Sequence, residues 1–317
     1  MRYCGKAPLL IALLAFAFPL PGAGAEQLPP RTASPLDVMQ IHSGHSLTDS
    51  YMAWPAPGRL VLATKLRSRV NPHDTIAKST IPGSPMSWRW THASGTPDAK
   101  AEIGNYELLV TTESVPLRVG PASFKRGTLD WIDKWIDHAW KQGNSGQGAE
   151  VMLYSTWVSW QNGKGDEADI PFRKRLDIDG GRWEQMQDHA NAIRPAGMPP
   201  IYMIPGHRMM MRIYDDIEAS RAPEMTHISD VFKDDIHPNA AGQYAIACLV
   251  YAVIYQRDPR ELPNKLAREH DTFTSSQAQY FKTIAWEIAT GYDRTGFRAD
   301  QVQGRRQGAL SQPKTEQ

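Results

Sequence analysis

Four short apolar segments, each bounded by turn-forming residues, constrain the fold of this chain more than any other feature. They cover Leu36–His42, Asn105–Thr112, Ala149–Trp157 and Pro199–Pro205. None shows the clear alternation of apolar and polar residues that marks a strand with one face in water. Because each segment is short and mostly apolar, we interpret all four as strands buried on both faces.

Helical patterns separate and follow these segments, in residues 127–143, 180–197, 239–258 and 275–293. The charged stretch Gln161–Gly181 is expected to be a long loop near the strand ends. Strands buried on both faces and separated by helices predict an α/β fold of three layers, α/β/α, around a mostly parallel sheet. In such sheets ligands bind at the carboxyl ends of the strands.

The first 25 residues are typical of a secretory signal peptide. Arg2 and Lys6 precede an apolar run, and Ala23-Gly24-Ala25 has the small residues that signal peptidase cuts after. The alternative, a membrane anchor, fits less well, because the run is short for a span of roughly 20 residues and contains prolines. We expect a periplasmic or secreted protein with one domain over residues 26–300 and a disordered tail over 301–317.

The charge balance excludes a nucleic-acid-binding role. The whole chain has 35 basic and 34 acidic residues, and cleavage after Ala25 would remove two basic residues and leave 33 against 34. A nearly neutral chain without a basic face offers little attraction to phosphates. Cleavage would also remove Cys4, so Cys248, in an apolar helical pattern, is expected to be a buried and inert thiol. No further segment is apolar enough to predict a membrane partner.

Ser46 follows the first predicted strand, in the stretch "QIHSGHSLTD" that begins at Gln40. Serine and glycine are common turn residues, so this stretch alone leaves open whether Ser46 is a nucleophile or a turn former. Its position just past the carboxyl end of a buried strand favours a functional role.

Asp234 and His237 stand three residues apart in "KDDIHPNAAG", directly before a predicted helix. A nucleophilic serine needs a base within hydrogen-bond distance, and that base needs a partner that fixes its tautomer. An aspartate three residues before a histidine in one turn can be that partner. The alternative is an acidic helix start beside a surface histidine, and the spacing alone does not decide between them.

Together, "SGHSLTD" near the start and "DDIHPNAAG" near the end of a parallel α/β pattern resemble the SGNH (GDSL) hydrolase family. The resemblance runs from about Leu36 to Tyr255 in the order of elements and implies a flavodoxin-like α/β/α fold. It implies Ser46 as the nucleophile, His237 as the general base and Asp234 as the carboxylate that orients the base. It also implies no cofactor.

The middle of the chain matches the family less closely. The family places an oxyanion-binding glycine after the second strand, where Gly83 stands, so the backbone N–H groups of Ser46 and Gly83 are the expected oxyanion donors. His45 replaces the usual aspartate of the first motif, and Glu113 stands where the family has an asparagine. We expect both to lie behind the catalytic groups, with Glu113 turned toward a cation such as Arg89.

Four tryptophans near the predicted strand ends are expected either to meet the sugar rings of a carbohydrate substrate or to pack in the core, which is the commoner role of tryptophan. Trp88, Trp90, Trp157 and Trp160 could stack on sugar rings, whereas Trp131, Trp135 and Trp140 are assigned to the core by their helical spacing. The remaining histidines show no ligand spacing, so no metal site is predicted.

These observations favour an exported serine esterase, a carboxylic ester hydrolase that acts on O-acyl groups of a carbohydrate. Two alternatives stay open at this stage. One is a carbohydrate-binding protein without catalysis that kept the fold, for which His45 and Glu113 are the evidence. The other is an acyltransferase that acts on an exported glycan with the same three residues.

Overall fold

The computed structural model describes residues 28–297 except 54, 96, 118–120 and 164. The expected signal peptide and C-terminal tail lie outside these residues and stay predictions. The five-stranded sheet has the order β2-β1-β3-β4-β5, and every neighbouring pair is parallel. Its strands are β1 (Gln40–Gly44), β2 (Ile76–Thr80), β3 (Leu108–Thr111), β4 (Glu150–Ser155) and β5 (Tyr202–Pro205).

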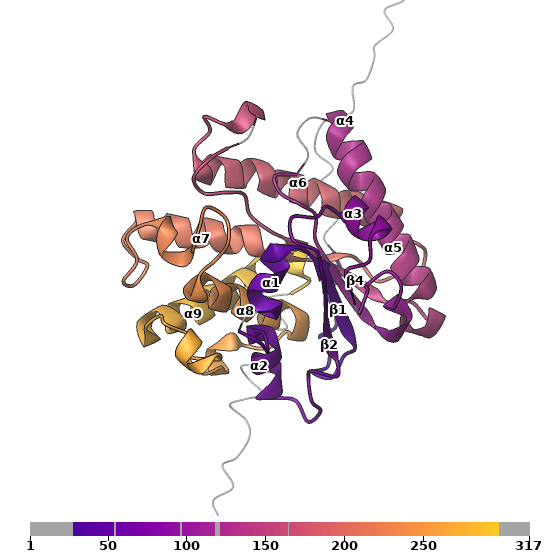
Figure 1. Cartoon of the computed structure of the whole chain (residues 1–317), viewed down its shortest axis with the longest axis horizontal. Helices are drawn as coiled ribbons and strands as arrows, with labels where there is room; N and C mark the ends of the chain where they lie inside the picture. The colour runs from indigo at the N-terminus through magenta and orange to yellow at the C-terminus, as the bar shows by residue number, and fades with distance from the viewer. Residues whose placement is uncertain (1–27, 54, 96, 118–120, 164, 298–317) are drawn as a thin grey trace, which may run out of the picture.

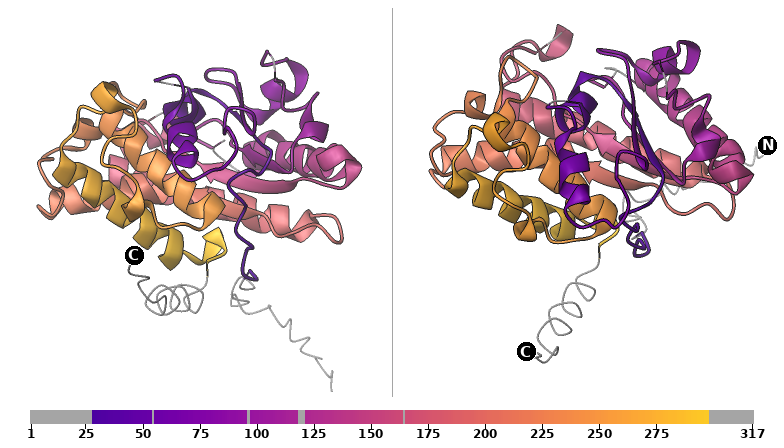
Figure 2. Two further views of the ribbon diagram at one scale, coloured as in Figure 1. Left: turned by 90° about the horizontal axis from the view of Figure 1, so that it is seen from below. Right: turned by 60° about the horizontal axis from the view of Figure 1, so that its bottom comes forward.

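Helices cover both faces of this sheet, as Figures 1 and 2 show, and the three-layer α/β/α prediction is confirmed. On one face lie α1 (Ser46–Met52), α2 (Arg59–Lys65), α7 (Gly206–Glu218), α8 (Ala240–Tyr255) and α9 (Ser275–Gly291). On the other face lie α3 (Met86–Thr91), α4 (Pro121–Phe124), α5 (Asp130–Gln142) and α6 (Phe172–Ile193). Strand order 2-1-3-4-5 is that of the flavodoxin-like folds.

Alternate side chains of each strand enter two separate cores. In β3, for example, Leu108 and Val110 pack toward α8, and Leu109 packs toward α5. Since both sets are apolar, the strand shows no polar alternation in its sequence, which is why the four apolar segments were identifiable as buried strands.

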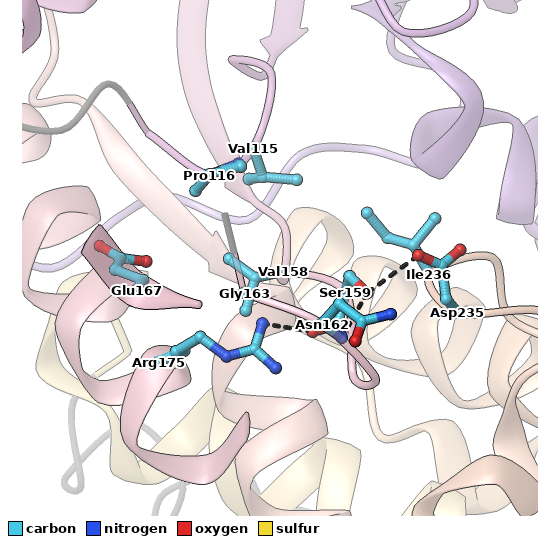
Figure 3. A pocket seen from close by; sticks show the side chains of 10 residues that line it. All are labelled: Val115, Pro116, Val158, Ser159, Asn162, Gly163, Glu167, Arg175, Asp235 and Ile236. Atoms are coloured by element: carbon cyan, nitrogen blue, oxygen red, sulfur yellow. Dashed lines mark hydrogen bonds between the residues drawn. The ribbon is translucent and has the colours of Figure 1, made fainter. Parts of the chain in front are cut away.

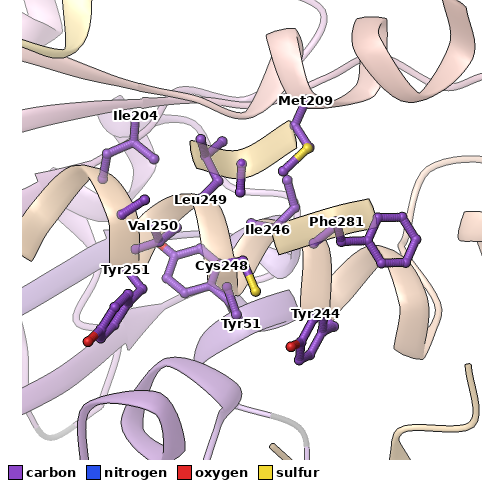
Figure 4. Close-up of a cluster of buried hydrophobic side chains, with 14 of the residues drawn as sticks. Tyr51, Ile204, Met209, Tyr244, Ile246, Cys248, Leu249, Val250, Tyr251 and Phe281 are labelled. Carbon is purple, nitrogen blue, oxygen red and sulfur yellow. The ribbon is translucent and has the colours of Figure 1, made fainter. Parts of the chain in front are cut away.

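Helix α8 is apolar on nearly every side, and Figure 4 shows its side chains packed with those of Tyr51, Ile204, Met209 and Phe281. Every residue from Ala241 to Tyr255 is buried, and the helix packs on α9, α2 and α7 as well as on the strands. Cys248 in its middle is buried, and burial raises the pKa of its thiol to about 12, in line with an inert thiol. Among the described residues, no helix is long and apolar enough to cross a membrane.

The structure corrects the sequence interpretation in two places. β2 is an additional strand that the four apolar segments did not include, and it lies at the edge of the sheet. The predicted loop Gln161–Gly181 is irregular only in its first part, because α6 begins at Phe172. Buried Arg175 and Asp179 occupy the inner face of α6 and hide its apolar periodicity.

Three fully buried histidines make the stability of the fold depend on pH. Burial lowers the pKa of His42, His45 and His207 to about 3 each. The unfolded chain takes up these protons below about pH 6.5 and the folded chain does not, so stability falls as the pH drops from about 6.5 toward 3. Burial raises the pKa of Asp179 to about 6, which has the opposite sign and offsets part of this loss.

We therefore expect the free energy of unfolding in urea to decrease on acidification below pH 6.5, by about 3 kcal/mol per pH unit, because the three histidine protons less the one bound by Asp179 leave two. His207→Gln removes one of the protons that are taken up on unfolding, so the slope of the free energy of unfolding against pH should become smaller by about 1.4 kcal/mol per pH unit. His73→Gln, at an exposed histidine, should leave the slope as it is. Equal slopes for the wild type and His207→Gln would contradict the assignment of a buried, neutral His207.

Candidate active site

Ser46 is the first residue of α1 and lies directly beyond the carboxyl end of β1. His45 caps the helix, since its Nδ1 accepts a hydrogen bond from the N–H of Leu47 at 3.3 Å. Gly44 has to lack a side chain here, because a Cβ at this position would lie 1.9 Å from Oγ1 of Thr48. The small-residue turn of the sequence thus holds a half-buried serine at the start of a helix.

Asp234 and His237 lie in a turn before α8. The turn is closed by the N–H of Lys233, which donates to the carbonyl of His237 at 2.9 Å. Asn239 ends the turn and caps α8, with its side-chain oxygen accepting from the N–H groups of Ala241 and Gly242. The position of this turn is therefore set by the buried helix that follows it.

The structure brings Ser46, His237 and Asp234 together. Nε2 of His237 lies 2.8 Å from Oγ of Ser46, and Nδ1 of His237 lies 2.9 Å from Oδ2 of Asp234. About a third of the His237 side chain and almost half of the Asp234 side chain are exposed, at 33% and 45%. The serine and the base are thus in hydrogen-bond contact at a surface that a substrate can reach.

Asp234 is held as a carboxylate. Partial burial opposes its charge, but the N–H groups of His237 and Ile236 donate to its Oδ1 at 2.7 and 3.0 Å, and these bonds keep its pKa below the ordinary value. A carboxylate can only accept hydrogen bonds, so Nδ1 of His237 carries the proton in this contact. Nε2 then faces Ser46 with its lone pair.

The loop after β4 stabilises the Asp234–His237 turn through hydrogen bonds to its backbone carbonyls. The sequence did not reveal this role. The indole N–H groups of Trp157 and Trp160 donate to the carbonyls of Ile236 and Asp234 at 2.8 and 2.9 Å. The N–H of Trp160 donates to the carbonyl of Asp235 at 2.8 Å. Two tryptophans directly after a strand were the available signal, but residue type alone does not tell a ring that binds substrate from one that donates to a turn.

Of the four tryptophans expected to meet a sugar, only Trp88 is largely exposed. Trp157 is fully buried, so its expected role is wrong. Trp90 packs edge-on against Trp135 in the core under α3. Trp88 is 49% exposed, and its ring stacks on His92 at 3.6 Å between ring centroids.

Gly83 lies in an exposed turn after β2 with a positive φ of 67°. This turn is beside the Ser46 turn, because β2 pairs with β1 up to Thr80 and Gly44, and the N–H of Ile81 donates to the carbonyl of Gly44 at 3.1 Å. Within the part of the chain that the structure describes, no acceptor contacts the backbone N–H of Ser46 or of Gly83. Both groups are therefore available as donors.

Glu113 is buried and turned into the protein. Its Oε1 accepts from the N–H of Met86 at 3.0 Å and from the N–H of Ser114 at 2.7 Å. Burial raises the pKa of Glu113, and the nearby charge of Arg89 opposes this rise. Its other oxygen, Oε2, is buried without a hydrogen-bond partner among the described residues.

The expected pairing of Glu113 with Arg89 is only partly right. The two charges interact, but the ion pairs within 4 Å in the described residues do not include them. Arg89 donates instead to the carbonyls of Ser84 and Thr112. Burial lowers the pKa of Arg89 to about 10, so it keeps its charge at neutral pH.

His45 connects the two loops that depart from the family motifs. Its Nε2 donates to the backbone carbonyl of Glu113 at 3.1 Å, while its Nδ1 accepts from Leu47. Both ring nitrogens are therefore occupied, and the ring is buried and neutral. In the described part of the chain, no group of three or more histidine, cysteine or acidic side chains could hold a metal ion.

No family model matches the chain, and no curated protein matches it in sequence. Solved structures are similar to it, among them the following two. One is a candidate GDSL-like lipase from Parabacteroides merdae, with 12% identity, a TM-score of 0.45 and coverage of 73% of this chain and 98% of that one. The other is a two-domain esterase active on acetylated mannans, with 16% identity, a TM-score of 0.36 and coverage of 67% of this chain and 47% of that one.

The topology itself agrees with the resemblance in the sequence. The sheet has the flavodoxin-like strand order, Ser46 follows its first strand, and the Asp234–His237 turn precedes the last helix that packs on the sheet. The chain has a flavodoxin-like three-layer α/β/α fold.

Proposed function

We propose that this protein is a serine esterase in which Ser46 is the nucleophile and His237 the general base. The observation that carries the proposal is the 2.8 Å contact between Nε2 of His237 and Oγ of Ser46, with Nδ1 of the same ring bound to Asp234. A neutral imidazole in this tautomer can take the serine proton as Oγ attacks an ester carbonyl. O-acyl esters of carbohydrates are the substrates that we propose.

The reaction then follows from these contacts. Attack by Oγ forms a tetrahedral intermediate, and the carbonyl oxygen becomes an oxyanion. His237 returns the proton to the departing alcohol oxygen, the carbon–oxygen bond of the ester breaks, and the acyl group stays on Ser46. Water enters, His237 takes its proton, and attack on the acyl-enzyme releases the acid and restores the serine hydroxyl.

The backbone N–H groups of Ser46 and Gly83 are the proposed oxyanion donors. Both follow neighbouring parallel strands at the same edge of the sheet, and both lack an acceptor in the described residues. Fixed donors aimed at a developing negative charge stabilise the transition state without reorganisation.

The contacts of His45 and Glu113 weaken the alternative of a binding protein without catalysis. Both residues hold loops behind Ser46, and Oε1 of Glu113 already accepts two backbone hydrogen bonds. Neither residue interrupts the contact between Ser46 and His237. The departures from the family motifs are therefore compatible with an active enzyme.

Ser46→Ala should lower turnover of a short-chain aryl ester by at least about a thousandfold, because the attacking oxygen is removed. The unfolding temperature should stay close to that of the wild type. A fluorophosphonate that reacts with activated serines should label the wild type and spare the variant. Activity within tenfold of the wild type would show that Ser46 is a turn residue and not the nucleophile.

Asp234→Asn should lower kcat/KM for the same ester on the order of 10³- to 10⁴-fold, because an amide no longer fixes the tautomer of His237 or stabilises its charged form. The neighbouring Asp235→Asn is the matched comparison and should cost far less, since Asp235 does not contact His237 and its bond from Ser159 survives in the amide. Equal losses from the two variants would show that the orienting carboxylate is wrongly assigned.

Glu113→Gln tests whether a buried carboxylate opposes the oxyanion. The amide oxygen can keep the bonds from Met86 and Ser114, so we expect a rate within about threefold of the wild type and a free energy of unfolding lower by about 1 kcal/mol. Rates with an aryl ester and urea unfolding check the two effects. A tenfold gain in rate, about 1.4 kcal/mol of barrier, would mean that the charge of Glu113 works against the reaction.

A further inference from the structure

A cavity of about 250 Å³ borders the turn that carries Asp234 and His237 (Figure 3). Its wall comes from the loops after β3 and β4, the start of α6 and the turn itself. These elements meet beyond the carboxyl ends of the strands, where α/β folds bind ligands. The lining includes Val158, Asn162, Glu167, Arg175, Asp235 and Ile236.

Three charged side chains line this cavity, and only one of them has an ion-pair partner. Glu167 pairs with Arg182 at 2.7 Å. Asp235 accepts one bond, from the hydroxyl of Ser159 at 2.9 Å. Within the described residues, no ion pair of 4 Å or less reaches Asp235 or Arg175.

Arg175 is 97% buried, and its N–H groups donate to main-chain carbonyls. It donates to the carbonyls of Ile170 at 2.8 Å and Ser159 at 2.7 Å, and a third contact, to Trp160, is long at 3.4 Å. A guanidinium has five N–H donors, so part of it remains free beside the cavity (Figure 3). Arg175 and Asp235, neither in an ion pair of 4 Å or less among the described residues, therefore face the same small space, and the Glu167–Arg182 ion pair lies beside them.

The charges of Asp235 and Arg175 determine which kind of ligand can bind in the cavity. Covering them with a long acyl chain would remove their water without replacing its hydrogen bonds, which is costly. A ligand carboxylate would meet Asp235, and a ligand ammonium would meet Arg175. A neutral group with several hydroxyls satisfies both, because each hydroxyl donates and accepts. Val158 and Ile236 supply an apolar wall for the C–H groups of a ring.

We propose that this cavity binds the alcohol half of the substrate as one uncharged sugar ring, with hydroxyls bound by Asp235, Arg175 and Asn162. The inference rests on the proposed esterase function for the reaction, but the binding of the sugar does not depend on catalysis. The volume, below that of pockets for drug-sized ligands, suits a single ring.

The first experiment compares two methyl glycosides acetylated at the same hydroxyl, a neutral glucoside and an acidic glucuronoside. The wild type should hydrolyse the glucoside with the higher kcat/KM. Asp235→Asn removes the negative charge and should shift the ratio of the two kcat/KM values toward the acidic substrate at least threefold. Gln161→Ala, at an exposed neighbour that does not line the cavity, should keep the wild-type ratio.

A ratio taken within one variant is insensitive to partial loss of folded enzyme. An unchanged ratio in Asp235→Asn, or a wild type that prefers the acidic substrate, would overturn the inference. The second experiment measures binding of unacetylated methyl glucoside by saturation-transfer NMR. Signal with the wild type that is lost in the double variant Asn162→Ala with Asp235→Asn supports the cavity, and absence of signal with the wild type overturns it.

The two experiments separate the two proposals. If the wild type hydrolyses neither acetylated glycosides nor aryl acetates but binds methyl glucoside through Asn162 and Asp235, the esterase proposal fails and the sugar cavity stands. If aryl acetates are hydrolysed and no glycoside binds or reacts, the esterase stands and the cavity proposal fails.

Discussion

The burial of α8 is the constraint on which the arrangement of the site depends. This helix is apolar around nearly its whole circumference, so it is stable only where the sheet covers one side and α9, α2 and α7 cover the others. The Asp234–His237 turn is attached to its first residue through the Asn239 cap. The packing of α8, which takes no part in the chemistry, thereby fixes the position at which His237 contacts Ser46, a residue 191 positions away in the sequence.

The turn itself is held by hydrogen bonds and not by burial. Its side chains are partly in water, as the base and its partner must be if substrate is to reach them. The loop after β4 compensates by donating to three successive carbonyls, those of Asp234, Asp235 and Ile236. Arg175 in turn donates to the carbonyls of Ser159 and Trp160 in that loop. The position of His237 is thus linked to α6 on the opposite face of the sheet.

The sequence predicted the parts of this fold in which burial and residue type agree. Four strands and α5, α8 and α9 are mostly apolar where they are buried, and they were identified. β2 was missed because only its first two residues, Ile76 and Ala77, are apolar, and the other three are polar on this edge strand. The first turns of α6 were missed because buried Arg175 looks like a surface residue in the sequence. Ser46, His237 and Asp234 were proposed from the resemblance of their two motifs to the SGNH (GDSL) hydrolases, whereas the indole donors and the cavity depend on contacts between distant loops that no local pattern encodes.

The two positions that depart from the family motifs are in contact with each other. His45 and Glu113 are far apart in the sequence, yet the ring of His45 donates to the main chain of Glu113, and its second nitrogen caps the helix that begins with Ser46. A neutral imidazole can donate with one nitrogen and accept with the other, which an ionised aspartate at the same place could not do. The side chain of Glu113 then holds the start of α3 through Met86, next to the Gly83 turn. The two departures thus form one connected support that runs from the loop after β3 to the turns carrying both proposed oxyanion donors.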